Sequence, residues 1–454
     1  MSSVRLAPGG VLDALRRRMQ VDGLDLVLDL ERSHGCRLVD ARDGRELLDF
    51  FTFFASNPLG MNHPALTEPG TFENLARVAV NKPSNSDVYT ETYGEFVEAV
   101  DRVARPESMR WFFFVDGGAL AVENALKVAF DWKVRRNFRK GHTAERGHQV
   151  LHLEWAFHGR SGYTLSLTNT ADPRKTMYFP KFDWPRIPSP AVHFPLDERE
   201  AERLDLAEAD ALARARAAFE ERRDDVAAII VEPIQAEGGD RHFRPSFLHG
   251  LRALADEFDA LLIFDEVQTG VGLTGTFWAF EQLGAVPDII TFAKKMQIGG
   301  LMAGPRVEEE PDNVFHVSSR INSTWGGHLV DMFRATRILE VIERERLVEN
   351  AARQGERLLG GLEALGARYT DLVGNVRGRG LMCAISFPDG ATRDRVIRDC
   401  HAARLLVLPC GQRSLRFRPA LNVEPAAIDE ALSILDGVLR VTDAPKGKTS
   451  STAP

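Results

Sequence analysis

The sequence predicts an α/β protein, with a large domain built on a mostly parallel sheet flanked by helices and a smaller α+β domain after it. Strand-like and helix-like segments alternate through the middle of the chain, and beyond about residue 328 helices mix with short strands. Alternation of this kind produces a parallel sheet covered on both faces. At 454 residues the chain is long enough for two or three domains with a large core.

The expected elements follow one another from the N-terminus. Short strands in an N-terminal arm precede an aromatic strand that turns through Gly117-Gly118 into a helix. A helix rich in Ala, Arg and Glu precedes an apolar strand that Glu232-Pro233 ends, because proline cannot donate to a sheet. The expected strands are 37–39, 46–50, 111–115, 149–153, 226–231, 260–264 and 289–293, and the expected helices are 119–134, 209–223 and 247–258.

The C-terminal part is expected to begin with one long helix near residues 329–349. Short strands should follow within 376–387, 405–408 and 414–417. The last residues are rich in Pro, Ser, Thr and Lys, which is typical of a disordered tail. We therefore expect an N-terminal arm that is part of the small domain (1–60), a large cofactor-binding domain (61–327), a C-terminal small domain (328–441) and a tail (442–454).

Composition excludes several classes of protein. The net charge is −8 and no long basic block appears, which argues against a nucleic-acid partner. Four scattered cysteines without a Cys-x-x-Cys pair argue against a disulfide framework or a metal site and fit a reducing, cytoplasmic location. The N-terminus lacks a signal pattern, and no apolar run approaches the ~20 residues that a membrane span needs.

Two charged residues stand where core strands end. Asp265 closes the run 260–264, and Lys294, which lies 29 residues further on, closes the run 289–293. Buried charges are costly unless each has a partner. Pyridoxal 5'-phosphate (PLP) would be a partner for both, since a lysine forms an imine with its aldehyde and an aspartate keeps its ring nitrogen protonated. Gln268 could donate to a ring oxygen. The alternative is two ordinary strand ends with solvated charges.

A Gly-Gly turn at the start of the helix 119–134 predicts a phosphate cradle. Gly117 and Gly118 let the backbone approach a ligand closely, and the helix N-terminus supplies free amides. Most such turns are only tight loops. The turn has neither the Gly-x-Gly-x-x-Gly pattern of dinucleotide-binding proteins nor the Gly-Lys-Ser/Thr of a P-loop.

Three further segments carry candidate ligand groups. Phe157 could stack on a flat ring and Arg160 could pair with a carboxylate, although a core Phe and a surface Arg are the plainer interpretation. Glu232 and Glu237 border a Gly-rich loop after a strand, where open α/β sheets bind ligands; a solvated acidic loop is the alternative. The segment 322–327, Asn-Ser-Thr-Trp-Gly-Gly, could offer a hydroxyl to phosphate or simply cap the next helix.

Two arginines, Arg416 and Arg418, lie on one face of a predicted strand. Such a pair suits anion binding, and it also suits a surface strand. We assign Arg416 to a possible anion site and Arg418 to the surface.

Together these motifs resemble the class III aminotransferases, which are PLP-dependent transferases of fold type I. The resemblance covers about residues 35–440. Its most specific marks are Phe157-His158-Gly159-Arg160, Glu232-Pro233-Ile234-Gln235, the run 264–270 and Lys294 after Pro287-Asp288. Within the class, the chain is most similar to the lysine 6-aminotransferase (lysine ε-aminotransferase) subgroup in residues 116–127, 238–244, 294–295 and 322–327.

The resemblance implies a set of cofactor contacts. Lys294 would be the Schiff-base lysine and proton shuttle, and Lys295 is its rival by position only. Asp265 would pair with the ring nitrogen, Gln268 with the ring hydroxyl oxygen, and Phe157 with the ring face. Backbone amides of Gly118 and Ala119 would bind the phosphate, which Thr324 would complete from the neighbouring subunit of a homodimer.

The resemblance also implies the substrates. L-lysine would give its ε-amino group to 2-oxoglutarate in a ping-pong cycle, which yields 2-aminoadipate 6-semialdehyde and L-glutamate. Arg160 and Asn322 would hold the lysine α-carboxylate. Glu237 and Arg416 would form a switch, closed when the amine donor is bound and open when Arg416 takes a carboxylate of 2-oxoglutarate.

Two features depart from the class pattern, and several alternatives stay open. Gly117-Gly118-Ala119 stands where many members have Ser-Gly-Thr or Ser-Gly-Ser, so a phosphate hydroxyl is missing, and His328 replaces a usual Asn.

The donor could instead be ornithine, acetylornithine or 4-aminobutyrate, or the reaction could be another PLP reaction on this fold. A nicotinamide oxidoreductase would need the missing dinucleotide motif, and an inactive binding protein would not need the intact Lys294, Asp265 and Gln268.

Overall fold

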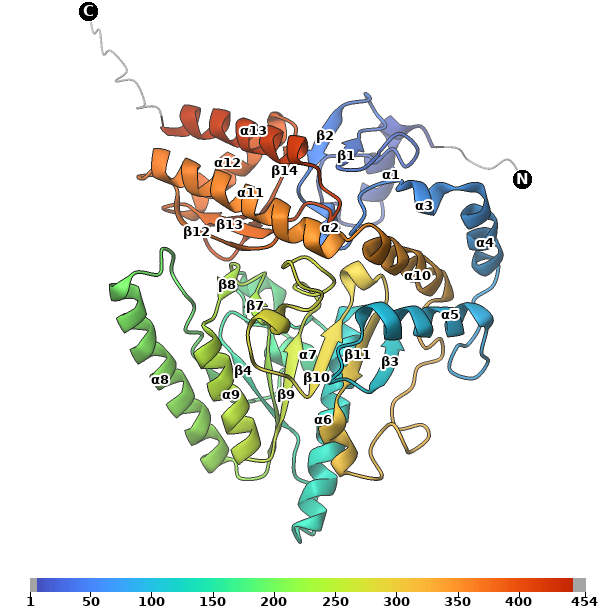
Figure 1. Ribbon diagram of the computed structural model, residues 1–454, viewed down its shortest axis with the longest axis vertical. Coiled ribbons are helices and arrows are strands. Elements are labelled where there is room, and N and C mark those ends of the chain that lie inside the picture. Colours follow the sequence, from blue (N-terminus) through green and yellow to red (C-terminus); the bar gives the residue numbers. More distant parts are fainter. Residues whose placement is uncertain (1–5, 444–454) are drawn as a thin grey trace, which may run out of the picture.

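A seven-stranded, mostly parallel sheet forms the centre of the computed structural model, which describes residues 6–443 (Figure 1). Its strand order is β3-β11-β10-β9-β6-β4-β5. Neighbours from β5 to β10 run parallel, whereas β11 is antiparallel to both β10 and β3. The predicted sheet type is therefore confirmed. The strands are β3 (Trp111–Val115), β4 (Gln149–Leu153), β5 (Arg186–Ile187), β6 (Val226–Val231), β9 (Leu261–Asp265), β10 (Ile289–Phe292) and β11 (Gly299–Ala303).

Helices cover both faces of this sheet because its central strands are apolar on both sides. On β9, Leu262 and Phe264 belong to one buried cluster together with helix α9 (Pro245–Glu257), and Leu261 and Ile263 belong to another together with helix α6 (Gly118–Arg139). Successive strand residues point to opposite faces, so one uninterrupted apolar run serves two helix layers. Helix α8 (Glu198–Glu221) packs outside α9 (Figure 1).

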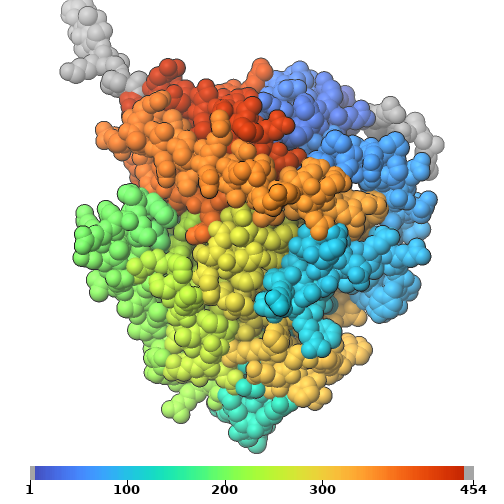
Figure 2. Space-filling view, viewed as in Figure 1, coloured from blue at the N-terminus to red at the C-terminus, as the bar shows by residue number. Residues whose placement is uncertain are grey.

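A second group of sheets and helices lies above the main sheet and joins the two ends of the described chain. Strand β2 pairs in parallel with β14, with Leu48 opposite Leu405. Figures 1 and 2 show the N-terminal residues in blue against the C-terminal helices in orange and red. The strands are β1 (Arg37–Val39), β2 (Glu46–Asp49) and β14 (Leu405–Leu406), then β12 (Gly374–Arg379), β13 (Met382–Ser386), β15 (Leu408–Cys410) and β16 (Ser414–Phe417), and the helices are α11 (Leu347–Arg368), α12 (Gly390–Ala402) and α13 (Pro425–Asp443).

The single long helix expected near 329–349 is wrong. The structure has two helices, α10 (Leu329–Arg344) and α11, which are separated at Glu345 and Arg346. Arg346 adopts a left-handed backbone with φ 53°, which ends one helix without the Gly or Pro that usually signals such a break. The remaining α-helices and strands are α1 (Val11–Arg16), α2 (Thr52–Ala55), α3 (Pro64–Thr67), α4 (Pro69–Ala79), α5 (Glu91–Ala99), α7 (Gly162–Leu167), β7 (Ile234–Gln235) and β8 (Arg241–His242).

Most expected strands match closely, and the C-terminal boundary differs. The predicted strands 111–115, 149–153, 226–231 and 414–417 coincide with β3, β4, β6 and β16. Helix α13 continues through Asp443, so residues 442 and 443 are helical rather than part of a tail. Residues 444–454 of the predicted tail, and residues 1–5 of the arm, lie outside the described residues. The division at residues 60 and 327 stays a prediction.

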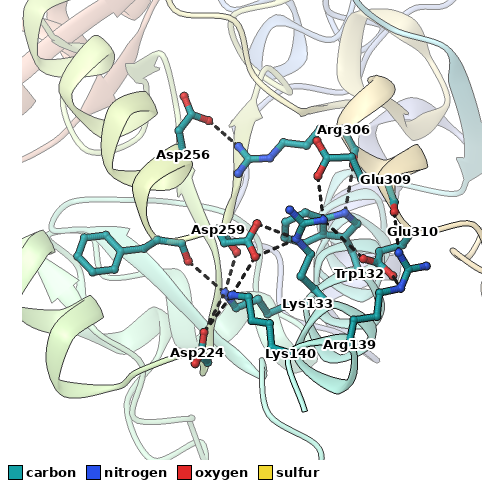
Figure 3. Close-up of polar contacts among 12 residues, drawn as sticks. Trp132, Lys133, Arg139, Lys140, Asp224, Asp256, Asp259, Arg306, Glu309 and Glu310 are labelled. Atoms are coloured by element: carbon teal, nitrogen blue, oxygen red, sulfur yellow. Dashed lines mark hydrogen bonds and ion pairs between the residues drawn. The ribbon is translucent and has the colours of Figure 1, made fainter. Parts of the chain in front are cut away.

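The end of α6 that is remote from its first turn is fixed by a buried lysine (Figure 3). The Nζ of Lys133, which is 0% exposed, donates to the carbonyls of Phe258 at 3.1 Å and Asp259 at 2.7 Å. Around it, Lys140 pairs with the carboxylates of Asp224 and Asp259. These contacts attach the helix to the loop that enters β9.

Residues 6–443 contain neither a membrane-spanning helix nor a cluster of metal-binding side chains. None of the helices there combines the length and the apolar character that crossing a bilayer requires. In the same range, His, Cys, Asp and Glu side chains do not gather in threes in a way that could hold a metal ion.

Candidate functional site

A cavity of about 1500 Å³ opens at the carboxyl ends of the central strands. Nine of the eleven predicted site residues line it, and Asn322 and Thr324 do not. The lining comes from the ends of the main sheet, from the first turn of α6, from the segment 171–175, from N-terminal residues between 22 and 56, and from the region around β15 and β16. The nine are Gly118, Ala119, Phe157, Arg160, Glu237, Asp265, Gln268, Lys294 and Arg416.

Asp265, the last residue of β9, is held by a histidine that the sequence analysis did not single out. Its Oδ2 lies 2.8 Å from Nδ1 of His158, and its Oδ1 accepts from the amide of Val267 at 3.1 Å. Both side chains are buried, and Nε2 of His158 has no hydrogen-bond partner in the part of the chain that the structure describes. The place of His158 beside Phe157 in the motif was the available signal.

Only one residue of the pair Lys294-Lys295 faces the cavity. Lys294 lines it, with a left-handed backbone of φ 45°, whereas Lys295 is 2% exposed and donates to the carbonyls of Gln268 at 2.8 Å and Ala55 at 3.4 Å. Burial lowers the pKa of the Lys294 amine, and the Asp265 carboxylate acts in the opposite direction. A lowered pKa leaves more of this amine neutral, the form that can attack a carbonyl or take a proton.

The first turn of α6 forms an open cradle of backbone amides. The helix begins at Gly118 after Gly117, whose φ of 86° favours glycine, and the amides of a first turn have no acceptor within the helix. Gly159 lies against this turn, since a Cβ there would stand 2.7 Å from the Cβ of Ala119, and its φ is +124°. Gly118 and Ala119 both line the cavity, so the free amides of this first turn lie beside it, at the positive end of the helix dipole.

Glu232 serves mainly to fix the loop that carries Phe157. It is 4% exposed, and its carboxyl accepts from the amides of Phe157 at 2.9 Å and Ala236 at 3.1 Å. Burial, and after it the nearby Asp265 carboxylate, raises the pKa of Glu232 well above its ordinary value. These bonds hold the Phe157 ring at the cavity wall.

Glu237 and Arg416 both line the cavity but are not paired with each other in this structure, and the predicted switch, which closes when the amine donor is bound, stays a prediction. The carboxylate of Glu237 pairs with the ammonium of Lys175, a residue that the sequence analysis missed. Arg416 is 4% exposed, and its Nε and Nη1 have no hydrogen-bond partner among residues 6–443. Glu237 and its possible cationic partners come from distant segments of the chain. A local sequence pattern therefore could not indicate which cation pairs with Glu237.

The surface assignment of Arg418 is wrong. This side chain is 1% exposed, and its Nη2 donates to Oδ1 of Asp240 at 2.6 Å. All four residues of β16 are buried, because both faces of that strand are covered. Because neither face of this strand is exposed, the alternation of residues along it could not identify a surface side chain.

The segment with Asn322 and Thr324 lies outside the cavity of the single chain. Both residues are exposed, and the segment packs on residues 84–86, with the amide of Asn85 donating to the carbonyl of Trp325 at 3.2 Å. His328, the departure noted in the sequence, caps α10, because its Nδ1 accepts from the amide of Val330 at 3.2 Å.

The groups that face the cavity fit PLP. A carboxylate at the end of β9, an amine at Lys294 and free amides at α6 match a ring nitrogen, an aldehyde and a phosphate. The Oε1 of Gln268 is buried without a hydrogen-bond partner in the described residues, so it can contact a ring hydroxyl. Phe157 supplies an aromatic wall.

Comparisons with known proteins agree with this arrangement. The family model described as aminotransferase class-III matches residues 19–439. The L-lysine-epsilon aminotransferase of Mycobacterium tuberculosis is 57% identical over 96% of each chain, and that of Streptomyces clavuligerus is 52% identical over 94% of this chain and 93% of its own. A solved structure of lysine aminotransferase from M. tuberculosis superposes with a TM-score of 0.94 at 56% identity, covering 96% of this chain and all of that one.

Proposed function

The chain belongs to the class III aminotransferases, and on that premise we propose that it transfers the ε-amino group of L-lysine to 2-oxoglutarate with PLP as cofactor. The products are 2-aminoadipate 6-semialdehyde and L-glutamate, formed in a ping-pong cycle. The observation that carries the proposal is the cavity in which Lys294 and Asp265 line the same space as the α6 amides. The relatives named for the lysine reaction support the choice of donor.

When bound, PLP supplies an aldehyde that takes the amine and a protonated ring that accepts the electron pair of the donor carbon. The chain supplies the control of protons. Asp265, held by His158 at 2.8 Å, keeps a proton at the ring nitrogen. Lys294, with its lowered pKa, takes the proton from the donor carbon and delivers it to the cofactor carbon.

The donor is held at its far end. For an ε-amine, the α-carboxylate of lysine lies several bonds from the reacting carbon, so its partner must be remote from Lys294. Arg160 is exposed and lines the cavity, which suits this role, and we assign Asn322 of a second subunit beside it.

We propose a homodimer with shared active sites. Thr324 and Asn322 are exposed and lie outside the cavity of their own chain, where Thr324 could reach the phosphate cradle of a partner. Large apolar side chains near this segment and near the cavity loops are unusually exposed: Tyr178 by 92%, Tyr89 by 77%, Trp325 by 45% and Leu120 by 44%. A second copy of the chain would bury such a surface. Sedimentation of the wild-type protein tests the dimer, and loss of PLP affinity in Thr324→Ala tests the shared cradle.

We also propose a cytoplasmic location. Cys36, Cys383, Cys400 and Cys410 are all free. Unpaired cysteines persist most readily in a reducing compartment. Fractionation of cells that produce the full-length chain tests this point.

The visible absorption of the PLP-loaded protein tests the proposed donor. Adding L-lysine without a keto acid should replace the pyridoxal band by the pyridoxamine band, faster than ornithine, acetylornithine or 4-aminobutyrate does. Conversion by one of these other amines instead of lysine would keep the class and reject the substrate. Recovery of the pyridoxal band on adding 2-oxoglutarate would complete the cycle.

A further inference from the structure

We propose that Lys175 is a positioning residue for the second half-reaction: it holds the Glu237 carboxylate and so keeps Arg416 free for the distal carboxylate of the acceptor. This inference rests on the proposed function, since it assumes that a dicarboxylate keto acid follows an amine donor in one cavity. The switch would then involve three residues instead of two, because the Glu237 carboxylate can pair with either Lys175 or Arg416.

The contact that suggests this role lies within the cavity itself. Lys175, Glu237 and Arg416 all line it, and the ammonium of Lys175 is paired with Oε1 of Glu237. The side chains of Lys175 and Glu237 are 28% and 24% exposed, so solvent only partly screens the pair. The Oε2 of Glu237 is buried and has no hydrogen-bond partner within residues 6–443, which leaves it open to a second cation.

The backbone around Glu237 is fixed, so its side chain is the part that can move. The amide of Gly411 donates to the carbonyl of Glu237 at 2.9 Å. The Nε of Arg377 donates to the backbone carbonyl of Asp240 at 2.7 Å. Gly238 leaves no room for a shift either, because a Cβ there would stand 2.2 Å from the carbonyl oxygen of Trp155. A change of partner must therefore come from rotation of the Glu237 side chain.

Lys175 lies in a short capped turn that borders the cavity. It ends the short 3₁₀ turn Pro173–Lys175, whose start is capped by Asp172 through the amide of Arg174 at 3.1 Å. Its Nζ lies 6.0 Å from the ring centroid of Phe157, the residue expected on the cofactor face. The ammonium thus lies near both the Glu237 carboxylate and the Phe157 ring.

Arg416 needs an anion that the surrounding chain does not provide. The residue is 4% exposed, and its Nε and Nη1 have no hydrogen-bond partner in the described structure. Burial lowers the pKa of Arg416, and nearby acidic groups, Glu237 among them, act in the opposite direction. Asp240 also lies near Arg416 but is paired with Arg418, so Glu237 or a substrate carboxylate is left to stabilise the buried charge. Because Lys175 pairs with Glu237, the Arg416 guanidinium remains free to bind a substrate carboxylate.

Glutarate, an unreactive five-carbon dicarboxylate, isolates this step in the PLP-loaded protein. In Lys175→Met, Glu237 should pair with Arg416, and the Kd for glutarate should rise about tenfold, which corresponds to ~1.4 kcal/mol of added competition. Lys175→Arg should restore most of the affinity. Arg174→Met is the matched control, since this neighbouring cation lines the cavity but pairs with Asp172, and its glutarate affinity should stay within about twofold of wild type.

The double variant gives the decisive comparison. Without the Glu237 charge there is nothing for Lys175 to hold, so Lys175→Met should have little effect on glutarate affinity in a Glu237→Gln background. An equal loss in both backgrounds, or wild-type affinity in Lys175→Met, would overturn the inference. The reaction of the wild-type protein with L-lysine is measured in the same experiment. If the wild-type protein does not react, the proposed function is wrong. If it reacts and Lys175→Met has wild-type glutarate affinity, only the role of Lys175 is rejected.

Discussion

The Nδ1 of His158 lies 2.8 Å from Oδ2 of Asp265, and both side chains are buried at the end of β9. The other carboxylate oxygen accepts from the amide of Val267 at 3.1 Å. The orientation of Asp265 is therefore set by one side chain and one backbone group. An aspartate that must hold a proton at a ring nitrogen gains from such a fixed geometry.

Removing the imidazole should slow the chemistry more than it weakens cofactor binding. We expect His158→Ala to lower the single-turnover rate with L-lysine by roughly 10- to 100-fold, the effect of losing a hydrogen bond to a charged group. His158→Asn, which can still donate to Asp265, should lose less. Stopped-flow absorbance measures both rates. Equal rates in all three proteins would show that Asp265 does not depend on this contact.

A methyl group at position 159 should damage the phosphate cradle. A Cβ there would stand 2.7 Å from the Cβ of Ala119, and the backbone φ of +124° disfavours any L side chain. We expect Gly159→Ala to weaken PLP binding at least about tenfold, as measured by titration of the apoprotein. The control is Gly141→Ala, where φ is +94° but no heavy atom lies within 4 Å. Similar losses in the two variants would assign the effect to backbone strain rather than to the cradle.

Glu266 should make stability depend on pH. Burial raises the pKa of this carboxyl to about 7, from 4.5. A raised pKa means that the folded state binds the extra proton, so the contribution is fully present below pH 4.5 and is lost as the pH rises through 7. Over that window the contribution is on the order of 3 kcal/mol. Thermal unfolding should show that Glu266→Gln flattens the decline of Tm between pH 5 and pH 8, and an unchanged pH profile would reject this assignment.

The buried Lys133 should matter for stability and not for the reaction (Figure 3). Its ammonium donates to the carbonyls of Phe258 and Asp259, and burial lowers its pKa to about 8. Lys133→Met leaves these carbonyls without a donor, which should cost roughly 1–3 kcal/mol. The residue lies 15 positions after Gly118, about 22 Å along α6, so the rate with L-lysine should not change. A slower reaction with unchanged Tm would contradict this separation.

Local patterns predicted the sheet where strands are apolar runs with clear ends, as in β3, β4 and β6. Strand β11 was missed because it begins with Gly299 and Gly300, and glycine is rare in strands. The reason lies in the fold: a Cβ at Gly300 would stand 2.5 Å from the carbonyl oxygen of Phe113 on β3. A contact across strands explains this glycine, and such a contact cannot be read from a short window of sequence.

The candidate site shows the same limit. Lys294, Asp265 and Gln268 lie in short motifs, and their place in one cavity followed from the rule that strand ends meet at one edge of a sheet. The partner of Glu237 is 62 residues away in the chain, and Arg418 finds Asp240 178 residues away. Ion pairs between such distant residues depend on how the elements pack. The charged residues could therefore be identified from the sequence, but their partners could not.

Reduction of the PLP-loaded protein with borohydride, followed by peptide fragmentation in a mass spectrometer, tests the central claim most directly. Borohydride fixes the cofactor on the amine that carries it. The structure places Lys294 in the cavity and binds Lys295 to backbone carbonyls, so the phosphopyridoxyl group should be found on Lys294, and Lys295→Met should keep it there. Modification of Lys295, or of neither lysine, would contradict the account.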